Sequence, residues 1–169
     1  MISSDEARQR ATDNFKSGLN CTQSVVEVFA EELGFDKNVL MSLALPFGGG
    51  TCRMRETCGT FNGIMMCLGM KMGVPTGDKD RKDEVYKIGQ ELARRFREKN
   101  GSIICRELLG LVPMGTSEAL MKSGKADEHK ASEPVSEART EEYYKKRPCA
   151  ELCGVAAEIF ARWLEEFNS

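Results

Sequence analysis

The sequence is poor in the residues on which most enzyme sites and nucleic-acid surfaces depend. Its 169 residues include one histidine, His129, which lies in a polar stretch, and only 7% are aromatic. Lysine and arginine number 24 and aspartate and glutamate 26, which gives a net charge of −2. No basic region stands out, so binding to nucleic acid or to an anionic membrane surface is not expected. A transition-metal site would have to take nearly all of its soft ligands from thiolates.

The sequence has no long hydrophobic run, and its first residues do not predict a secretory leader. The longest apolar stretch, residues 63–73, contains Lys71 and is far shorter than the roughly 20 residues that cross a bilayer. The N-terminal residues MISSDEARQR are acidic and polar and lack the apolar core of a signal peptide. We therefore expect a cytoplasmic protein that has no membrane partner.

Helical periodicity and capping residues predict an all-α fold. A chain of this length with 41% hydrophobic and 30% charged residues is typical of one domain, here residues 1–169. We expect a helical bundle of about six to seven helices and no strand. Residues 111–147 are polar and predict a long, mobile connection before the last helix, with one weak helix near 118–122. The expected helices are 3–17, 20–34, 37–45, 57–72, 78–99, 102–109 and 148–167.

Cysteine is the residue type that the sequence does have, with seven in the chain. An odd number without a secretory signal argues against a framework of structural disulfides. No CxxC pair is present, which argues against a zinc ribbon and a thioredoxin-type motif, and no CxxCH is present for covalent haem attachment. Metal ligation or thiol redox chemistry is the better interpretation.

Four of the cysteines fall in the first turns of four predicted helices. The first N–H groups of a helix have no partner within the helix, and the helix dipole adds partial positive charge at that end. Both effects stabilise a thiolate, so we expect a lowered pKa and raised reactivity or metal affinity for each of these thiols. Cys21 and Cys58 each follow an expected helix cap, Asn20 and Thr57. Cys105 lies three residues after the expected cap Ser102, and Cys149 follows the first-turn proline Pro148.

Simpler interpretations stay open beside a shared site. Free cysteine often packs as a small hydrophobic residue, and Cys67, inside the apolar helix 57–72, fits that role. Cys149 and Cys153 lie one turn apart, which suits a ligand pair or a disulfide. Gly59 and Gly63 lie on one face of the apolar helix, where each costs about 1 kcal/mol relative to alanine. The usual compensation is close approach of another backbone or of a cofactor.

Several segments, taken together, resemble a known family. They are Asn20-Cys21-Thr22-Gln23, then Phe47-Gly48-Gly49-Gly50 with RMRETCGTFNG at 53–63, GSIICRELLG at 101–110, and Cys149 ahead of Ala156-Ala157-Glu158-Ile159. In order and spacing they resemble the C_GCAxxG_C_C family of redox-active proteins over nearly the whole chain. The four cysteines of that family map onto Cys21, Cys58, Cys105 and Cys149, and its Cys-Gly-Ala-x-x-Gly motif includes Gly59 and Gly63.

The resemblance implies an iron–sulfur function. The family is also similar to the cluster-bearing part of split-Soret cytochromes, which implies a [2Fe–2S] centre held by the four family cysteines, with the two motif glycines at the site. The haem-binding part of those cytochromes has no counterpart here, so the redox partner is another protein or a small molecule. The chain departs from the motif at Thr60, where the family has alanine.

Some residues near the motif have no assigned role. Cys52, Cys67 and Cys153 are not family positions, and Cys52 is a candidate alternative ligand or resolving thiol. The charged residues just before Cys58 would surround the site, form a docking rim or be solvated loop charges: Arg53, Arg55 and Glu56.

Two other functions use the same four thiols. In a metal-free thiol redox protein they would cycle between dithiol and disulfide, and in a structural site they would hold one zinc ion. The sequence does not decide whether the protein is an enzyme. The apolar, glycine-bearing helix 57–72 is compatible with a homodimer.

Overall fold

The computed structural model describes residues 1–125, 127, 130 and 132–169. These residues form nine α-helices, one short 3-10 helix and no strand, so the all-α prediction is confirmed and the expected number of helices was slightly low. The elements are α1 (Ser4–Lys16), α2 (Cys21–Phe29), α3 (Lys37–Ala44), η1 (Leu45–Phe47), α4 (Gly59–Met72), α5 (Lys79–Asn100), α6 (Cys105–Leu108), α7 (Thr116–Ser123), α8 (Glu141–Lys146) and α9 (Cys149–Asn168). No helix of the described residues is long and apolar enough to cross a membrane.

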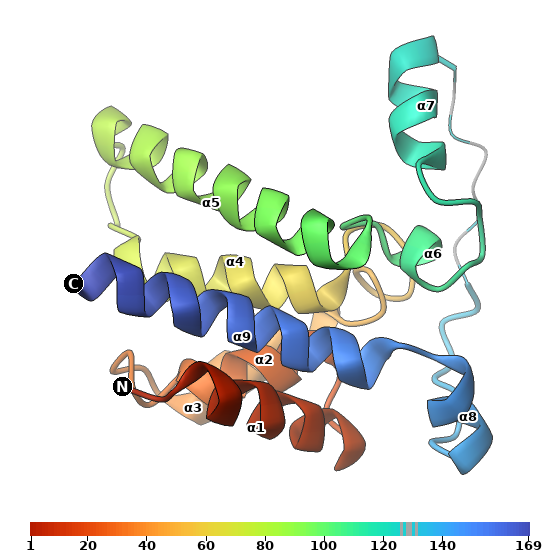
Figure 1. The fold of residues 1–169 in the computed structure, drawn as a ribbon, viewed down its shortest axis with the longest axis horizontal. Coiled ribbons are helices and arrows are strands. Elements are labelled where there is room, and N and C mark those ends of the chain that lie inside the picture. Colours follow the sequence, from red (N-terminus) through yellow and green to blue (C-terminus); the bar gives the residue numbers. More distant parts are fainter. Residues whose placement is uncertain (126, 128–129, 131) are drawn as a thin grey trace.

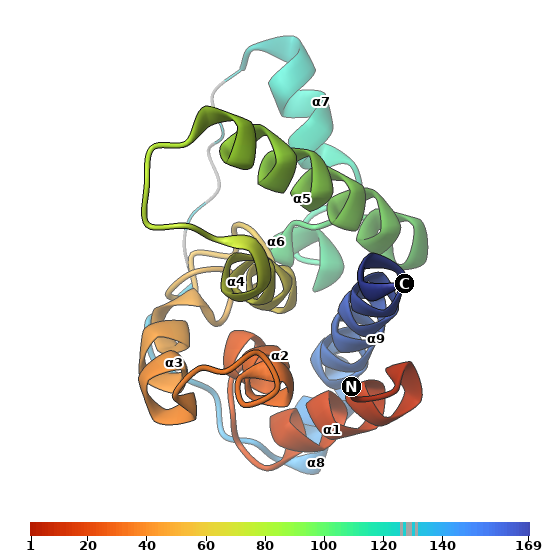
Figure 2. The same cartoon turned by 90° about the vertical axis from the view of Figure 1, so that its left-hand side faces the viewer.

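The core forms around α9, which packs against α1, α2, α4 and α5. Figure 1 shows these helices running side by side, and Figure 2 shows them grouped around a common centre. Most of α9 is buried, and the ring of Phe160 lies edge-on to Phe29 of α2 with 4.9 Å between centroids. Both α4 and α9 begin at the end of the bundle that carries α6 and α8 (Figure 1). That end therefore collects several helix starts.

Among the helix boundaries that differ from the sequence prediction, the end of α2 and the start of α6 differ by three or more residues, for local reasons. α2 ends at Phe29, and the residues that follow form a hydrogen-bonded turn closed by Gly34 in the left-handed conformation (φ 81°). α6 begins at Cys105, because the Ser102 hydroxyl accepts a hydrogen bond from the N–H of Ile104 (2.9 Å) before the helix starts. Ser102 thus shapes the approach to α6 without being its cap.

The polar region 111–147 contains more structure than its composition predicts. α7 covers the weak helix expected near 118–122, but α8 was missed. The Thr140 hydroxyl caps α8 by accepting from the N–H of Tyr143 (3.2 Å), and Tyr143 and Tyr144 both pack on Phe15 of α1. Tertiary contact therefore overrides the weak local propensity of this segment. His129 lies outside the described residues.

Candidate cysteine site

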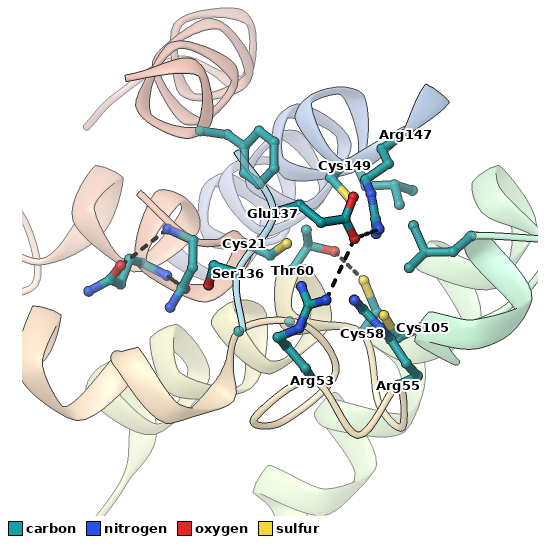
Figure 3. Close-up of a pocket in the computed structure, with 18 of the residues that line it drawn as sticks. Cys21, Arg53, Arg55, Cys58, Thr60, Cys105, Ser136, Glu137, Arg147 and Cys149 are labelled. Carbon is teal, nitrogen blue, oxygen red and sulfur yellow. Dashed lines mark hydrogen bonds and ion pairs between the residues drawn. The ribbon is translucent and has the colours of Figure 1, made fainter. Parts of the chain in front are cut away.

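The four cysteines predicted to share a site line one cavity at the end of the bundle. The cavity has a volume of about 760 Å³. Figure 3 shows Cys21, Cys58, Cys105 and Cys149 reaching it from separate elements. All four are free thiols; Cys21 is partly exposed and the other three are buried. The fold therefore brings together residues that are far apart in the sequence.

Each of these cysteines stands at the start of a helix. Cys21, Cys105 and Cys149 are the first residues of α2, α6 and α9, and Cys58 is itself the N-cap of α4. At α2 the expected cap is present, because Asn20 forms a complete capping box with the residue three positions on. The positive ends of four helices therefore point towards the cavity.

Backbone hydrogen bonds hold Cys58 and Cys105 as a pair. Thr57, expected as a helix cap, instead forms an isolated antiparallel bridge with Ile104. The N–H groups of both cysteines donate across this bridge to carbonyls of the opposite segment, at 2.8 and 2.6 Å. Cys58 and Cys105 each follow one residue of the bridge, so they are diagonal neighbours across the two segments. Diagonal neighbours lie on the same face of an antiparallel pair, roughly 7–8 Å apart. Both side chains accordingly point to the cavity and lie next to each other in Figure 3.

Cys21 and Cys149 form the second pair, and Cys153 joins them. Hydrogen bonds from the Cys149 thiol and from the Cys153 thiol are the two largest causes of a lowered pKa at Cys21. Cys153 is fully buried, and its sulfur lies 3.8 Å from the carbonyl oxygen of Cys21. The family pattern leaves Cys153 out. Its position one turn after Cys149 was the only feature of the sequence that placed it near the site.

The thiols of the cavity differ strongly in pKa. Hydrogen bonds, the largest of them from Cys149, lower the pKa of Cys21 well below its ordinary value. Burial raises the pKa of Cys58 to about 12 and also raises that of Cys105. The pKa of Cys149 is raised because its proton is held in the hydrogen bond to Cys21. The pKa of Cys21 is lowered as expected, but hydrogen bonds from neighbouring thiols lower it, not the helix start. At the other three cysteines the expected direction is wrong, because desolvation and neighbouring thiols raise the pKa.

A buried arginine lies at the wall of the cavity. Arg55 is only 4% exposed, and its Nε donates to the Ser132 hydroxyl (2.8 Å). Its guanidinium also lies against the sulfur of Cys105 and opposes the rise that burial causes in the pKa of that thiol. Among the described residues, no carboxylate pairs with Arg55. The charged lining is completed by Arg53, Arg139, Arg147 and Glu137. This excess of cations favours an anionic occupant of the cavity.

The other charged residues before Cys58 separate into two roles. Arg53 lines the mouth of the cavity and pairs with Glu137 (3.6 Å). Glu56 pairs instead with the buried Arg106 (2.6 Å) and does not line the cavity. The sequence left open whether these charges belong to the site or are solvated, and the structure places the two arginines, Arg53 and Arg55, at the cavity.

Two glycines let α4 approach α2 closely beside the site. A Cβ added to Gly59 would lie 3.0 Å from the Cβ of Cys21, and one added to Gly63 would lie 2.7 Å from the Cβ of Val25. The structure therefore places a helix against both motif glycines. Their absent side chains bring Cys21 next to the start of α4.

The remaining residues singled out in the sequence occupy different environments. Cys52 is exposed at the edge of the cavity, and its thiol donates to the carbonyl of Pro46 (3.3 Å). Cys67 is fully buried within α4 and is not among the described residues that line the cavity. The Thr60 hydroxyl lies 3.2 Å from the sulfur of Cys58, so the departure from the motif alanine adds a polar contact at the site.

Comparison with curated proteins finds no match, and comparison with solved structures finds none. One family model, with the description "Putative redox-active protein (C_GCAxxG_C_C)", matches residues 19–163. That range includes the four helix-start cysteines, both motif glycines and most of the cavity. This chain belongs to the C_GCAxxG_C_C family of redox-active proteins.

Proposed function

We propose that the protein transfers electrons through a [2Fe–2S] cluster held by Cys21, Cys58, Cys105 and Cys149. The observation that carries the proposal is the arrangement of the four thiols as two pairs on one cavity. A [2Fe–2S] centre takes four cysteine ligands, two on each iron. The pair from α2 and α9 would bind one iron, and the pair from α4 and α6 would bind the other.

The donor set fits such a centre in its chemistry. Thiolate sulfur is a soft ligand that suits iron–sulfur clusters. Among the described residues, no group of three or more His, Cys, Asp or Glu is placed to hold a single metal ion. One zinc ion would need its four ligands around a single point, whereas a two-iron centre needs two pairs. We therefore propose the cluster ahead of structural zinc.

The charges at the site support the same assignment. Burial raises the pKa of Cys58 to about 12, so the bare thiol keeps its proton at neutral pH, and a bound cation would stabilise its thiolate. Arg55, buried without a carboxylate partner among the described residues, stands ready to balance the negative charge of the bound sulfurs. The helix N-termini add further partial positive charge on several sides.

The chain's own residues would set the properties of the centre. When bound, the cluster would supply one-electron redox chemistry at the cavity. Arg55 holds positive charge beside Cys105, and the Thr60 hydroxyl lies within hydrogen-bond distance of the Cys58 sulfur. Such contacts to ligand sulfur raise the reduction potential. We propose that the electron partner is a cytoplasmic protein or a small molecule that reaches the cavity mouth.

Purification of the full chain under strict anaerobic conditions tests the proposal. We expect a brown protein with visible absorbance and about two irons per chain. A colourless protein with stoichiometric zinc would support the structural alternative and contradict the electron-transfer proposal. A colourless, metal-free protein would also contradict it.

A second candidate function rests on the neighbouring thiols of Cys21 and Cys149, whose hydrogen bond lowers the pKa of Cys21. In a metal-free thiol redox protein, the Cys21 thiolate would attack a substrate disulfide and release one substrate thiolate. The Cys149 thiol, which lies beside Cys21, would then lose its proton and attack the mixed disulfide. The second substrate thiolate would leave, and a Cys21–Cys149 disulfide would remain. Mild oxidation of the metal-free chain should then remove two titratable thiols, and Cys149→Ala should abolish that loss.

A further inference from the structure

A strap, defined here as residues 132–139, crosses the mouth of the cysteine cavity (Figure 3). Pro134, Ser136, Glu137 and Arg139 of this strap line the cavity together with the four thiols. The strap contains no helix or strand. Its position therefore depends on the side-chain and backbone contacts along its length.

Both ends of the strap are fastened. At one end, the N–H of Ser132 donates to the carbonyl of Arg53 (3.1 Å), and Arg53 Nε donates to the carbonyl of Glu133 (2.6 Å). At the other end, the Arg139 guanidinium donates to the carbonyl of Phe15 in the last turn of α1 (3.0 Å) and to that of Leu19 after the helix (3.2 Å). It also lies 4.2 Å from the ring centroid of Phe15. These contacts hold the two ends of the strap and do not involve the side chain of Glu137.

Between the ends, Glu137 joins the strap to the cavity wall. Its carboxylate pairs with Arg53 (3.6 Å) and with Arg147, and Figure 3 shows it lying between these two arginines. The Glu137 side chain is 48% exposed, whereas each arginine side chain is only 19% exposed. Ion pairs with such an exposed partner contribute about 0–1 kcal/mol. Another anion can therefore replace this carboxylate at little cost.

We propose that the space between Arg53 and Arg147 is a binding site for a small oxyanion, with Glu137 as the group that fills it when no ligand is bound. The ligand class is a small molecule that carries a carboxylate or a phosphate group. The proposal extends the proposed function, because the bound molecule would sit at the mouth of the redox site. Anion binding itself does not depend on a cluster.

The cavity offers the room and the charge that this ligand needs. Its volume of about 760 Å³ lies within the range of small-molecule pockets, roughly 300–1,000 Å³. The described lining residues include four arginines and only one carboxylate, that of Glu137. The guanidinium groups present planar pairs of donors that match carboxylate and phosphate oxygens. Rotation of the Glu137 side chain would free the site, since the backbone hydrogen bond from Ser132 to Arg53 and the contacts of Arg139 hold the strap without Glu137.

Calorimetric titration of the full, reduced, metal-free chain tests the proposal, with inorganic phosphate and succinate as probes. Glu137→Gln removes the competing carboxylate and should tighten binding about two- to fivefold. Arg147→Gln should weaken binding at least about tenfold, because it removes one of the two cations. Glu133→Gln is the matched control for the first variant: it changes the charge equally, but Glu133 contacts Arg53 through its backbone carbonyl. Lys145→Gln, on exposed α8, is the control for the second.

The outcomes separate this proposal from the iron–sulfur assignment. Tighter binding in Glu137→Gln, weaker binding in Arg147→Gln and unchanged binding in both controls establish the site, even if the wild-type chain binds no iron. Preference for phosphate or for succinate then tells which oxyanion the site selects. Equal affinities in Glu137→Gln and Glu133→Gln, or an unchanged affinity in Arg147→Gln, would overturn the proposal, even if the wild-type chain binds two irons.

Discussion

Arg55 and Cys105 meet at the wall of the cavity, where a buried guanidinium lies against a thiol sulfur. A buried cation without an anionic partner is destabilising, and burial likewise disfavours a free thiolate. Each group supplies the charge that the other lacks once the sulfur is an anionic ligand. The pair therefore supports the proposal that the Cys105 sulfur acts as a charged ligand.

Replacement of Arg55 by Gln should lower the reduction potential of the proposed [2Fe–2S] centre. Loss of a nearby positive charge destabilises the reduced, more negative state. We expect a decrease on the order of 50 mV, which for one electron equals about 1.2 kcal/mol. A spectroscopic redox titration of the purified variant measures it. Arg94→Gln, on the exposed face of α5, should leave the potential unchanged. An unchanged potential in Arg55→Gln would show that Arg55 does not influence the reduction potential.

Thr60 should tune the same potential through its hydroxyl. Thr60→Val keeps the side-chain shape but removes the contact to the Cys58 sulfur, so the potential should fall. Thr60→Ser retains the hydroxyl and should keep the wild-type potential. The same titration measures both variants. Equal potentials in the valine and serine variants would show that the 3.2 Å contact has no electronic role.

The close approach of α4 to α2 makes Gly63 sensitive to a single added carbon. In Gly63→Ala the new Cβ would lie 2.7 Å from that of Val25, and overpacking of this kind costs about 1–3 kcal/mol. Gly69→Ala, later in the same helix, has no atom within 4 Å of the added Cβ and should stabilise the protein by about 0.5–1 kcal/mol. Urea unfolding of both variants compares the two effects. Stabilisation by both substitutions would mean that α2 and α4 are not in close contact.

The metal-free protein should lose stability as the pH rises from about 9 to 12. Cys58 keeps its proton up to a pKa of about 12 in the fold, whereas its ordinary value is 9.0. Between these values the unfolded chain releases the proton and the folded chain does not. Such a thiol therefore lowers the free energy of unfolding by about 1.4 kcal/mol per pH unit.

Urea unfolding at a series of pH values measures this slope. Cys58→Ala should make it shallower by about 1.4 kcal/mol per pH unit. Cys67→Ala should also flatten it, since burial raises the pKa of that thiol outside the cavity. Identical slopes in the wild type and both variants would contradict the raised pKa values.

The position of a cysteine at a helix start was predictable from the sequence, but the pairing of the four thiols across the cavity was not. Cys21 could be placed at a helix start because its cap, Asn20, lies next to it. The bridge between Thr57 and Ile104 depends on segments far apart in the chain, and no local pattern marks it. Cys153 approaches Cys21 only because α9 packs on α2.

The pKa values and the strap were beyond sequence reasoning for the same reason. Helix position predicts a lowered pKa, but the degree of burial, which a sequence does not give, reverses the direction at Cys58. The sequence predicts only a polar connection for the strap residues. The fold places Glu137 between Arg53 and Arg147.

The most direct test of the central claim is the iron content of five variants purified anaerobically beside the wild type. Single alanine substitutions at Cys21, Cys58, Cys105 and Cys149 should each abolish the visible absorbance and most of the bound iron. Cys67→Ala, which removes a fully buried thiol outside the cavity, should keep about two irons per chain. Iron that is lost equally in all five variants, or kept in all of them, would contradict a cluster held by the four helix-start thiols.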